Sequence, residues 1–278
     1  MDIGTGIRAT IADEAQAERD DDAPGAAARH FRVTAAPRRL WRGLLDLVLP
    51  PLCLACEAPL SDHDALCPKC WRELNFIRAP LCDHLGIPLP YDTGAPMLSA
   101  AAIADPPEYD HARAVGRYDG PMRHLIHDMK YQDNHISRRL FGRWLIEAGR
   151  DLIGNAQILV PVPLSRRRLL FRRFNQAQIL AAEVSRLSGL AVAPLTLERA
   201  RNTRSQVGLT RLERKANVAG AFRVTPRGEA IIAGKSVLLI DDVITTGATV
   251  SAAAKALKAK GAARVDVLAL ALVCDASA

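Results

Sequence analysis

The chain reads Ser236-Val-Leu-Leu-Ile-Asp-Asp-Val-Ile-Thr-Thr-Gly-Ala-Thr249 over the stretch that decides its fold. The apolar run Val237–Ile240 is typical of a buried parallel strand. Two carboxylates, Asp241 and Asp242, follow at its carboxyl end, where open α/β sheets bind their ligands. Small hydroxyl residues around Gly247 then lead into a helix, so hydroxyls and backbone N–H groups can face one phosphate. The alternative is a structural turn with helix-capping residues.

Apolar segments alternate with helical patterns around this stretch. We expect strands near 112–118, 157–162, 190–196, 236–241 and 264–273, and helices near 120–131, 136–150, 175–188 and 248–260. Gly189 and Gly261 fall where helix ends favour a left-handed residue. This alternation predicts an α/β fold with a mostly parallel sheet covered on both faces. No internal repeat is predicted.

The 278 residues suit one medium domain with a small satellite. We expect a disordered leader over 1–37, an amphipathic helix (38–50) and a cysteine-rich module within 38–110, and the α/β domain over 111–278. The helix either packs on a neighbouring domain or lies on a membrane surface. No apolar run is long enough to span a bilayer and no signal peptide is recognisable, so we expect no transmembrane segment and a cytoplasmic location.

Positive charge is concentrated in one part of a chain whose net charge is +7. Residues 161–215 hold 12 basic and three acidic side chains, whereas the rest of the chain holds 25 and 27. Such a concentration indicates an anionic ligand, either phosphates or nucleic acid. Aromatic residues are few, so no stacking platform for single-stranded nucleic acid is obvious.

Two parts of this basic region have candidate roles. Ser165, Arg166 and Arg167 follow a predicted strand and a proline-rich turn, and paired guanidinium groups are well suited to pyrophosphate. A solvated basic face is the alternative. The polar segment Arg199–Lys215 is predicted to be either a mobile lid or an ordinary basic loop.

Four cysteines form two knuckles of identical spacing. The ligand pairs are Cys53 with Cys56 and Cys67 with Cys70. Two knuckles supply four thiolates to one tetrahedral zinc ion, which leaves no open position for catalysis. A structural zinc site is therefore predicted, with redox-active or unpaired cysteines as the alternative. Cys82 and His84 resemble a remnant of a further knuckle that lacks its partner pair, so we expect one zinc ion.

The segment Asp241–Thr249 resembles the motif that binds 5-phosphoribosyl-1-pyrophosphate (PRPP) in type I phosphoribosyltransferases. Together with the cysteine knuckles and other segments, it makes the chain similar to the ComF/GntX family of double-zinc-ribbon proteins. The other matching segments are Cys70-Trp71, Tyr118–Arg123, Leu125-Ile126, Lys130-Tyr131, Val160–Leu164, Phe174–Gln176 and Thr203–Gln206. Many relatives have a glycine where this chain has Arg173, and later cysteine pairs are reduced to Cys82.

The resemblance implies a role for each matching residue. Asp241 and Asp242 would hold the ribose hydroxyls, either directly or through a magnesium ion that accompanies PRPP. The 5′-phosphate would bind to the loop residues Thr245, Thr246, Gly247, Ala248 and Thr249. The position of Ser165, Arg166 and Arg167 resembles the pyrophosphate loop.

Two functions are therefore compatible with the sequence. The first is an enzyme that transfers a phosphoribosyl group from PRPP, or a related phosphorylated ribose, to an unidentified acceptor. In that case Asp241, Asp242, Arg166 and Arg167 would carry catalysis, the arginines by electrostatic stabilisation. The second is an adaptor that handles single-stranded DNA during natural competence and uses the phosphoribosyltransferase fold for binding only.

Overall fold

The computed structural model describes residues 50–131, 137–164, 174–201 and 210–274. All of these residues belong to one unit, Asp46–Ala278. The predicted leader over 1–37 lies outside the described residues, as does the predicted helix over 38–50 except for its last residue.

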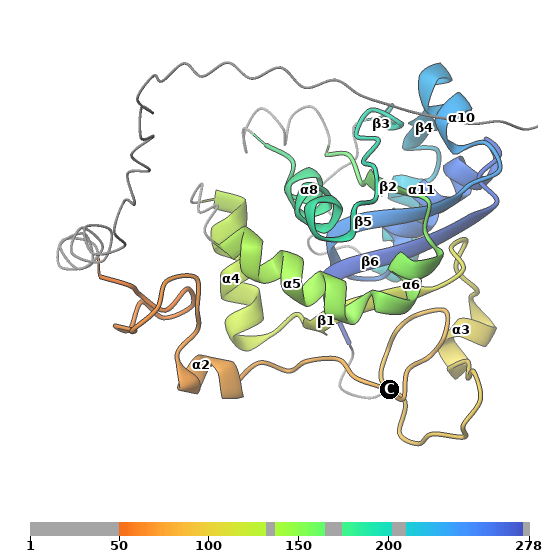
Figure 1. The fold of residues 1–278 in the computed structure, drawn as a ribbon. Coiled ribbons are helices and arrows are strands. Elements are labelled where there is room, and N and C mark those ends of the chain that lie inside the picture. Colours follow the sequence, from red (N-terminus) through yellow and green to blue (C-terminus); the bar gives the residue numbers. More distant parts are fainter. Residues whose placement is uncertain (1–49, 132–136, 165–173, 202–209, 275–278) are drawn as a thin grey trace, which may run out of the picture. The chain divides into compact units, whose positions relative to one another are not determined.

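Four parallel strands form the central sheet, which confirms the predicted fold class (Figure 1). In spatial order they are β1 (Ala112–Arg117), β6 (Arg264–Leu272), β5 (Ser236–Ile244) and β2 (Ile158–Pro161). Each neighbouring pair runs parallel, so the carboxyl ends of all four strands lie at one edge. The strand β5 continues to Ile244, beyond its predicted end at residue 241, and therefore carries Asp241 and Asp242 within the ladder.

Helices bury both faces of this sheet (Figure 1). One face is covered by α4 (Gly120–Tyr131), α5 (Arg138–Ala148), α6 (Arg150–Asn155) and α8 (Gln176–Ser188), and the other by α11 (Ala248–Lys258). Alternate residues of β5 point to opposite faces: Leu238 packs with α5 and α8, whereas Leu239 packs with α11. Strands that are buried on both faces have continuous apolar sequences, and the sequence therefore predicted a buried parallel strand here. No helix in the described ranges is both long and apolar enough to cross a bilayer.

The predicted strand over 190–196 is wrong. Within it only Val192 forms an isolated bridge, to Leu159 of β2. Pro194 lacks the N–H group that a sheet ladder requires, so pairing does not continue. A short strand forms just beyond, β3 (Leu197–Arg199), and pairs antiparallel with β4 (Phe222–Val224) in a separate two-stranded sheet.

Three further helices were not predicted as such. The predicted helix 136–150 corresponds to α5, and α6 is a separate helix that begins directly after Gly149 and continues beyond the predicted end. The helix α10 (Pro226–Ile232) lies between β4 and β5. The helix α9 (Arg211–Val218) begins inside the predicted lid, where Thr210 and Glu213 form a capping box. The remainder of the lid, residues 202–209, lies outside the described residues.

The segment before β1 contains a structural repeat, contrary to the sequence prediction. Residues 51–60 read Pro-Leu-Cys-Leu-Ala-Cys-Glu-Ala-Pro-Leu, and residues 80–89 read Pro-Leu-Cys-Asp-His-Leu-Gly-Ile-Pro-Leu. Both segments close through an isolated bridge between their second and ninth residues. Both turns have a positive φ at the seventh residue, 59° at Glu57 and 67° at Gly86. The two segments are therefore copies of one knuckle, and each is followed by a short helix, α2 (Pro68–Arg72) or α3 (Ala100–Ala104).

Candidate functional site

The two acidic residues lie side by side at the carboxyl edge of the sheet. The carboxylate of Asp241 accepts a hydrogen bond from the backbone N–H of Asp242 at 2.9 Å. The carboxylate of Asp242 forms an ion pair with Lys130 of α4, with 2.6 Å between Nζ and Oδ2. The sequence comparison had placed Lys130 in a matching segment, but no role could be assigned to it without this contact.

Asp241 differs from its neighbour in its electrostatic surroundings. Burial and the negative charge of Asp242 raise the pKa of Asp241 from 3.8 to about 8. Hydrogen bonding from the Asp242 N–H and the positive charges of Lys130 and Arg199 oppose this rise only in part. Near neutral pH, Asp241 is therefore poised to lose a proton when a cation or a hydrogen-bond donor approaches.

The raised pKa of Asp241 predicts a specific pH dependence of stability. Between about pH 4 and pH 8 the folded chain holds a proton that the unfolded chain has released, so stability falls as pH rises. We expect wild type to lose up to about 1.4 kcal/mol per pH unit relative to Asp241→Asn across this window. Urea unfolding of both proteins at about pH 6, 7 and 8 measures the difference. Parallel pH profiles would contradict the raised pKa.

The loop after β5 has the features of an anion site. Gly247 has a positive φ of 74° and stands at the N-cap of α11, where no side chain caps the helix. The N-terminus of α11 therefore has no side-chain cap from Gly247, and it carries the positive end of the helix dipole. Thr246 Oγ1 is buried and has no hydrogen-bond partner among the described residues. A buried hydroxyl without a partner is costly, and an anion in the loop would satisfy it.

The other predicted loop residues adjoin these groups. Thr245 is exposed, whereas Ala248 and Thr249 are half-buried in the first turn of α11. The five loop residues are thus brought together directly after the acidic pair, as predicted. Their contacts with a ligand remain a prediction.

A neighbouring segment that the sequence did not single out braces this loop. Tyr109 is buried, and its hydroxyl lies 3.4 Å from the position that a Cβ of Gly247 would occupy. The residues on either side of Tyr109 are fixed to α11 by ion pairs, Glu108 with Lys255 and Asp110 with Lys258, both at 2.8 Å. These contacts span about 150 positions in sequence, so no local pattern could have revealed them.

The predicted pyrophosphate-binding residues cannot be placed. Ser165, Arg166 and Arg167 lie outside the described residues. The flanking residues are well defined: Asn175 caps α8 with its side-chain oxygen and donates from its amide nitrogen to the carbonyl of Val162 at 3.0 Å. The end of β2 and the start of α8 are therefore fixed at the edge of the sheet that carries the acidic pair.

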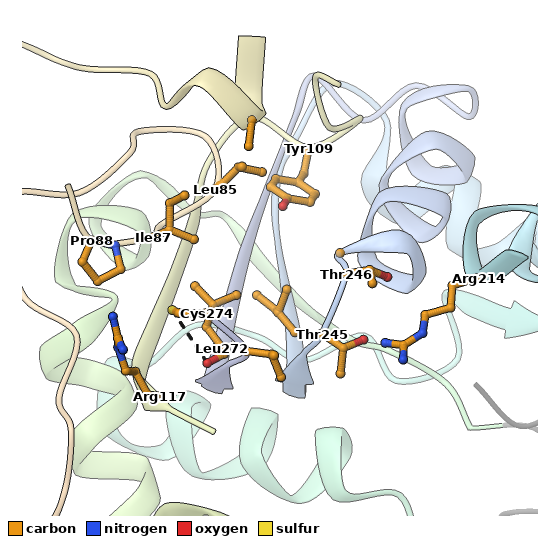
Figure 2. A pocket seen from close by; sticks show the side chains of 14 residues that line it. Leu85, Ile87, Pro88, Tyr109, Arg117, Arg214, Thr245, Thr246, Leu272 and Cys274 are labelled. Atoms are coloured by element: carbon orange, nitrogen blue, oxygen red, sulfur yellow. Dashed lines mark hydrogen bonds between the residues drawn. The ribbon is translucent and has the colours of Figure 1, made fainter. Parts of the chain in front are cut away.

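A pocket of about 380 Å³ opens beside the phosphate loop (Figure 2). Thr245, Thr246 and Gly247 form one side of it, and the carboxyl ends of β1, β5 and β6 form its base. Its volume lies in the range of small-molecule sites. The loop and the pocket together make this edge of the sheet the main candidate site.

The four knuckle cysteines form a second candidate centre. The sulfur atoms of Cys53, Cys56, Cys67 and Cys70 all lie within 4.8 Å of one another. The Cys56 and Cys67 sulfurs are 3.7 Å apart, close to the roughly 3.8 Å expected for two thiolates bound tetrahedrally to zinc. These residues are the only metal-ligating group of three or more among the described ranges.

Two of these thiols differ in proton affinity. Burial disfavours the Cys53 thiolate, but N–H groups of Cys67, Ala55 and Cys56 outweigh it and lower the pKa of Cys53 to about 6. Burial and the neighbouring thiols raise the pKa of Cys70. A metal ion would compensate for the cost of gathering four thiolates in one place.

The second knuckle has lost this chemistry. In the first knuckle the Cys67 N–H donates to Cys53 Sγ at 3.2 Å, and in the second the Ser99 N–H donates to Cys82 Sγ at 3.3 Å. The repeat thus aligns Cys82 with Cys53 and Ser99 with Cys67. By the same alignment, Leu85 stands in place of Cys56 and Ala102 in place of Cys70. Three of the four ligand positions in this half carry no metal-binding thiol.

Comparisons with known proteins agree with this arrangement. Residues 44–102 match the double zinc ribbon domain, and residues 176–277 match the phosphoribosyl transferase domain. The DNA utilization protein YhgH of Salmonella typhi is 32% identical over 228 residues, which cover 80% of this chain and 96% of that protein. Competence protein F of Haemophilus influenzae is 29% identical over 225 residues, which cover 79% and 96%.

A solved structure is also similar over part of the fold. It is the glutamine PRPP amidotransferase from B. subtilis in complex with ADP and GMP, 19% identical, with a TM-score of 0.33. The similarity covers 48% of this chain and 26% of that chain.

Proposed function

The chain belongs to the family of the YhgH and ComF proteins, and from this premise we propose that it binds PRPP at the carboxyl edge of its sheet. The observation that carries the proposal is the phosphate loop between β5 and α11. It combines a helix N-terminus that lacks a side-chain cap with a buried Thr246 hydroxyl that has no hydrogen-bond partner among the described residues. Both are donors that a 5′-phosphate would satisfy.

Binding of the ribose is the role that we propose for the acidic pair. We assign Asp241 and Asp242 to the ribose 2′ and 3′ hydroxyls, which donate hydrogen bonds to carboxylates. Lys130 holds Asp242 in position through its ion pair. A magnesium ion bound with PRPP would neutralise pyrophosphate charge, and the acids would contact it through its water ligands.

The reaction that we propose at this site is transfer of the phosphoribosyl group from PRPP to an acceptor. A nucleophile on the acceptor forms a bond to ribose C1 as the bond from C1 to the pyrophosphate oxygen breaks. Pyrophosphate leaves with the bonding electron pair, and the nucleophile gives up its proton to water. Arg166 and Arg167 would stabilise the negative charge that develops on pyrophosphate. Zinc held by the four cysteines would have a structural role only.

A second candidate function is binding of single-stranded DNA, since relatives are named for DNA utilization and competence. The specific observation is an aromatic group on the surface, in a chain of few aromatics. Trp71 is 49% exposed and packs against Phe76 and Trp144, at ring-centroid distances of 5.3 and 6.0 Å. These three rings line a second pocket, away from the phosphate loop, and the exposed Arg78 lines it too. An exposed indole beside a cation suits stacking with a base and contact with a phosphate.

Thermal unfolding with added ligands separates the two functions. If the loop binds PRPP, millimolar PRPP with magnesium should raise the Tm by several degrees, because a ligand present well above its Kd stabilises the folded state. Wild type should respond and Gly247→Val should not, because a side chain would enter the loop at a left-handed position. A response to oligonucleotide alone, lost at high salt and in Trp71→Ala, would replace the first function with the second.

A further inference from the structure

We propose that the pocket beside the phosphate loop binds the second substrate, and that this substrate carries an aromatic ring with a carboxylate. The inference rests on the proposed function in one respect: the adjoining loop must hold the phosphorylated ribose. It goes further by assigning the acceptor site and the chemical class of the acceptor.

The outer wall of this pocket comes from the second knuckle, in which three of the four ligand positions carry no thiol. Leu85, Ile87 and Pro88 line the pocket from the second copy, and Ala101 of α3 lines it too. Leu85 occupies the position equivalent to the ligand Cys56, and its side chain packs against the main core instead of a metal. With leucine at the position of a zinc ligand, this half of the ribbon presents an apolar surface over the edge of the sheet.

The remaining walls are also mostly apolar. Ile244, Leu272 and Val273 form the base at the ends of β5 and β6, and the buried ring of Tyr109 closes one side. Figure 2 shows the side chains of Leu85, Ile87 and Tyr109 lying around one space. A rigid ring buries its area against such walls with little loss of conformational entropy.

Two cations, Arg117 and Arg214, stand in this mostly apolar lining. Arg214 lies on the side of Thr245 and the phosphate loop (Figure 2), whereas the guanidinium of Arg117, at the end of β1, has no hydrogen bond or ion pair within the described part of the chain. Arg117 is half-buried, and Figure 2 shows its head beside Pro88, across the pocket from Thr245. A partly enclosed guanidinium between apolar residues favours a planar carboxylate, which it can bind through two parallel hydrogen bonds.

The position of the pocket fits an acceptor. Thr245, Thr246 and Gly247 line both the pocket and the phosphate loop. A ring held against Ile87 with its carboxylate on Arg117 would therefore present its opposite edge toward the loop and the bound ribose. A nitrogen on that edge is the group that would displace pyrophosphate.

Benzoate and benzamide are suitable probes because they share a ring and differ in charge. We expect ligand-observed NMR to show that wild type binds benzoate roughly tenfold more tightly than benzamide, because benzoate gains one charge-assisted contact. Arg117→Gln should abolish this preference and Arg117→Lys should retain part of it. Thermal shift with PRPP and magnesium should be unchanged in both variants, because Arg117 lies outside the loop and the acidic pair.

The outcomes are distinguishable. Equal binding of the two probes by wild type, or a benzoate preference that survives in Arg117→Gln, would overturn the assignment of this pocket even if PRPP binds. A benzoate preference that depends on Arg117 would support it. If that preference is present while PRPP gives no shift, the pocket is a carboxylate site and the proposed function fails instead.

Discussion

Replacing Asp241 and Asp242 with alanine should weaken PRPP binding by at least about tenfold while leaving the fold intact. A single charge-assisted hydrogen bond contributes roughly 1.5–3 kcal/mol, so the loss of two carboxylates makes tenfold a low estimate. The fold should survive because the core residues of β5, from Val237 to Ile240, precede the pair. Removal of the acids also eliminates the burial of a carboxyl group and the repulsion by Asp242 that together raise the pKa of Asp241, so unfolding stability should not fall.

Isothermal titration of PRPP with magnesium measures this effect. Asp128→Ala is the matched control, because it removes a carboxylate from α4 two residues before Lys130 without touching the pair. Asp241→Asn with Asp242→Asn keeps the size of both side chains and should also lose affinity. Equal PRPP affinity in wild type and the double alanine variant would show that these carboxylates do not bind the ribose. Absence of binding to every variant, wild type included, would remove PRPP altogether.

The central part of the fold could be predicted because its signals are local. The segment from Ser236 to Thr249 contains a strand, a ligand edge and a helix start within 14 residues, and the structure places β5 and α11 there. Gly189 and Gly261 also have the predicted left-handed conformation, with φ of 78° and 92°. The predicted strand over 190–196 is wrong because the segment, although apolar, contains Pro194, whose missing N–H interrupts strand pairing.

The contacts that complete the site could not be predicted, because they join distant segments. Lys130 reaches Asp242 only because α4 packs on the face of the sheet beside β5. Tyr109 meets Gly247 across an even longer separation. The repeat of the knuckle was missed for a different reason. Its second copy keeps one cysteine of four, but Pro-Leu-Cys and a later Pro-Leu recur at the same spacing in both copies and were a signal that could have revealed it.

The second large effect concerns the metal centre. Cys56→Ser should release zinc from the protein and loosen residues 51–80, because zinc binding and folding share one free energy in so small a module. Zinc binding to such sites contributes roughly 10 kcal/mol or more at neutral pH, so loss of one thiolate should unfold this segment locally. Elemental analysis gives the zinc content, and hydrogen exchange should show faster exchange over residues 51–80.

The second knuckle provides the matched control. Cys82 occupies the place of Cys53 in the metal-free copy, so Cys82→Ala should retain one zinc ion per chain and normal protection over residues 51–80. Wild type should contain one zinc ion, since Leu85, Ser99 and Ala102 cannot supply thiolates. Freshly purified wild type without zinc would refute the metal centre. Two zinc ions per chain would instead show that the second knuckle also binds a metal. Leu85 would then not be explained as a pocket residue at a position without a metal.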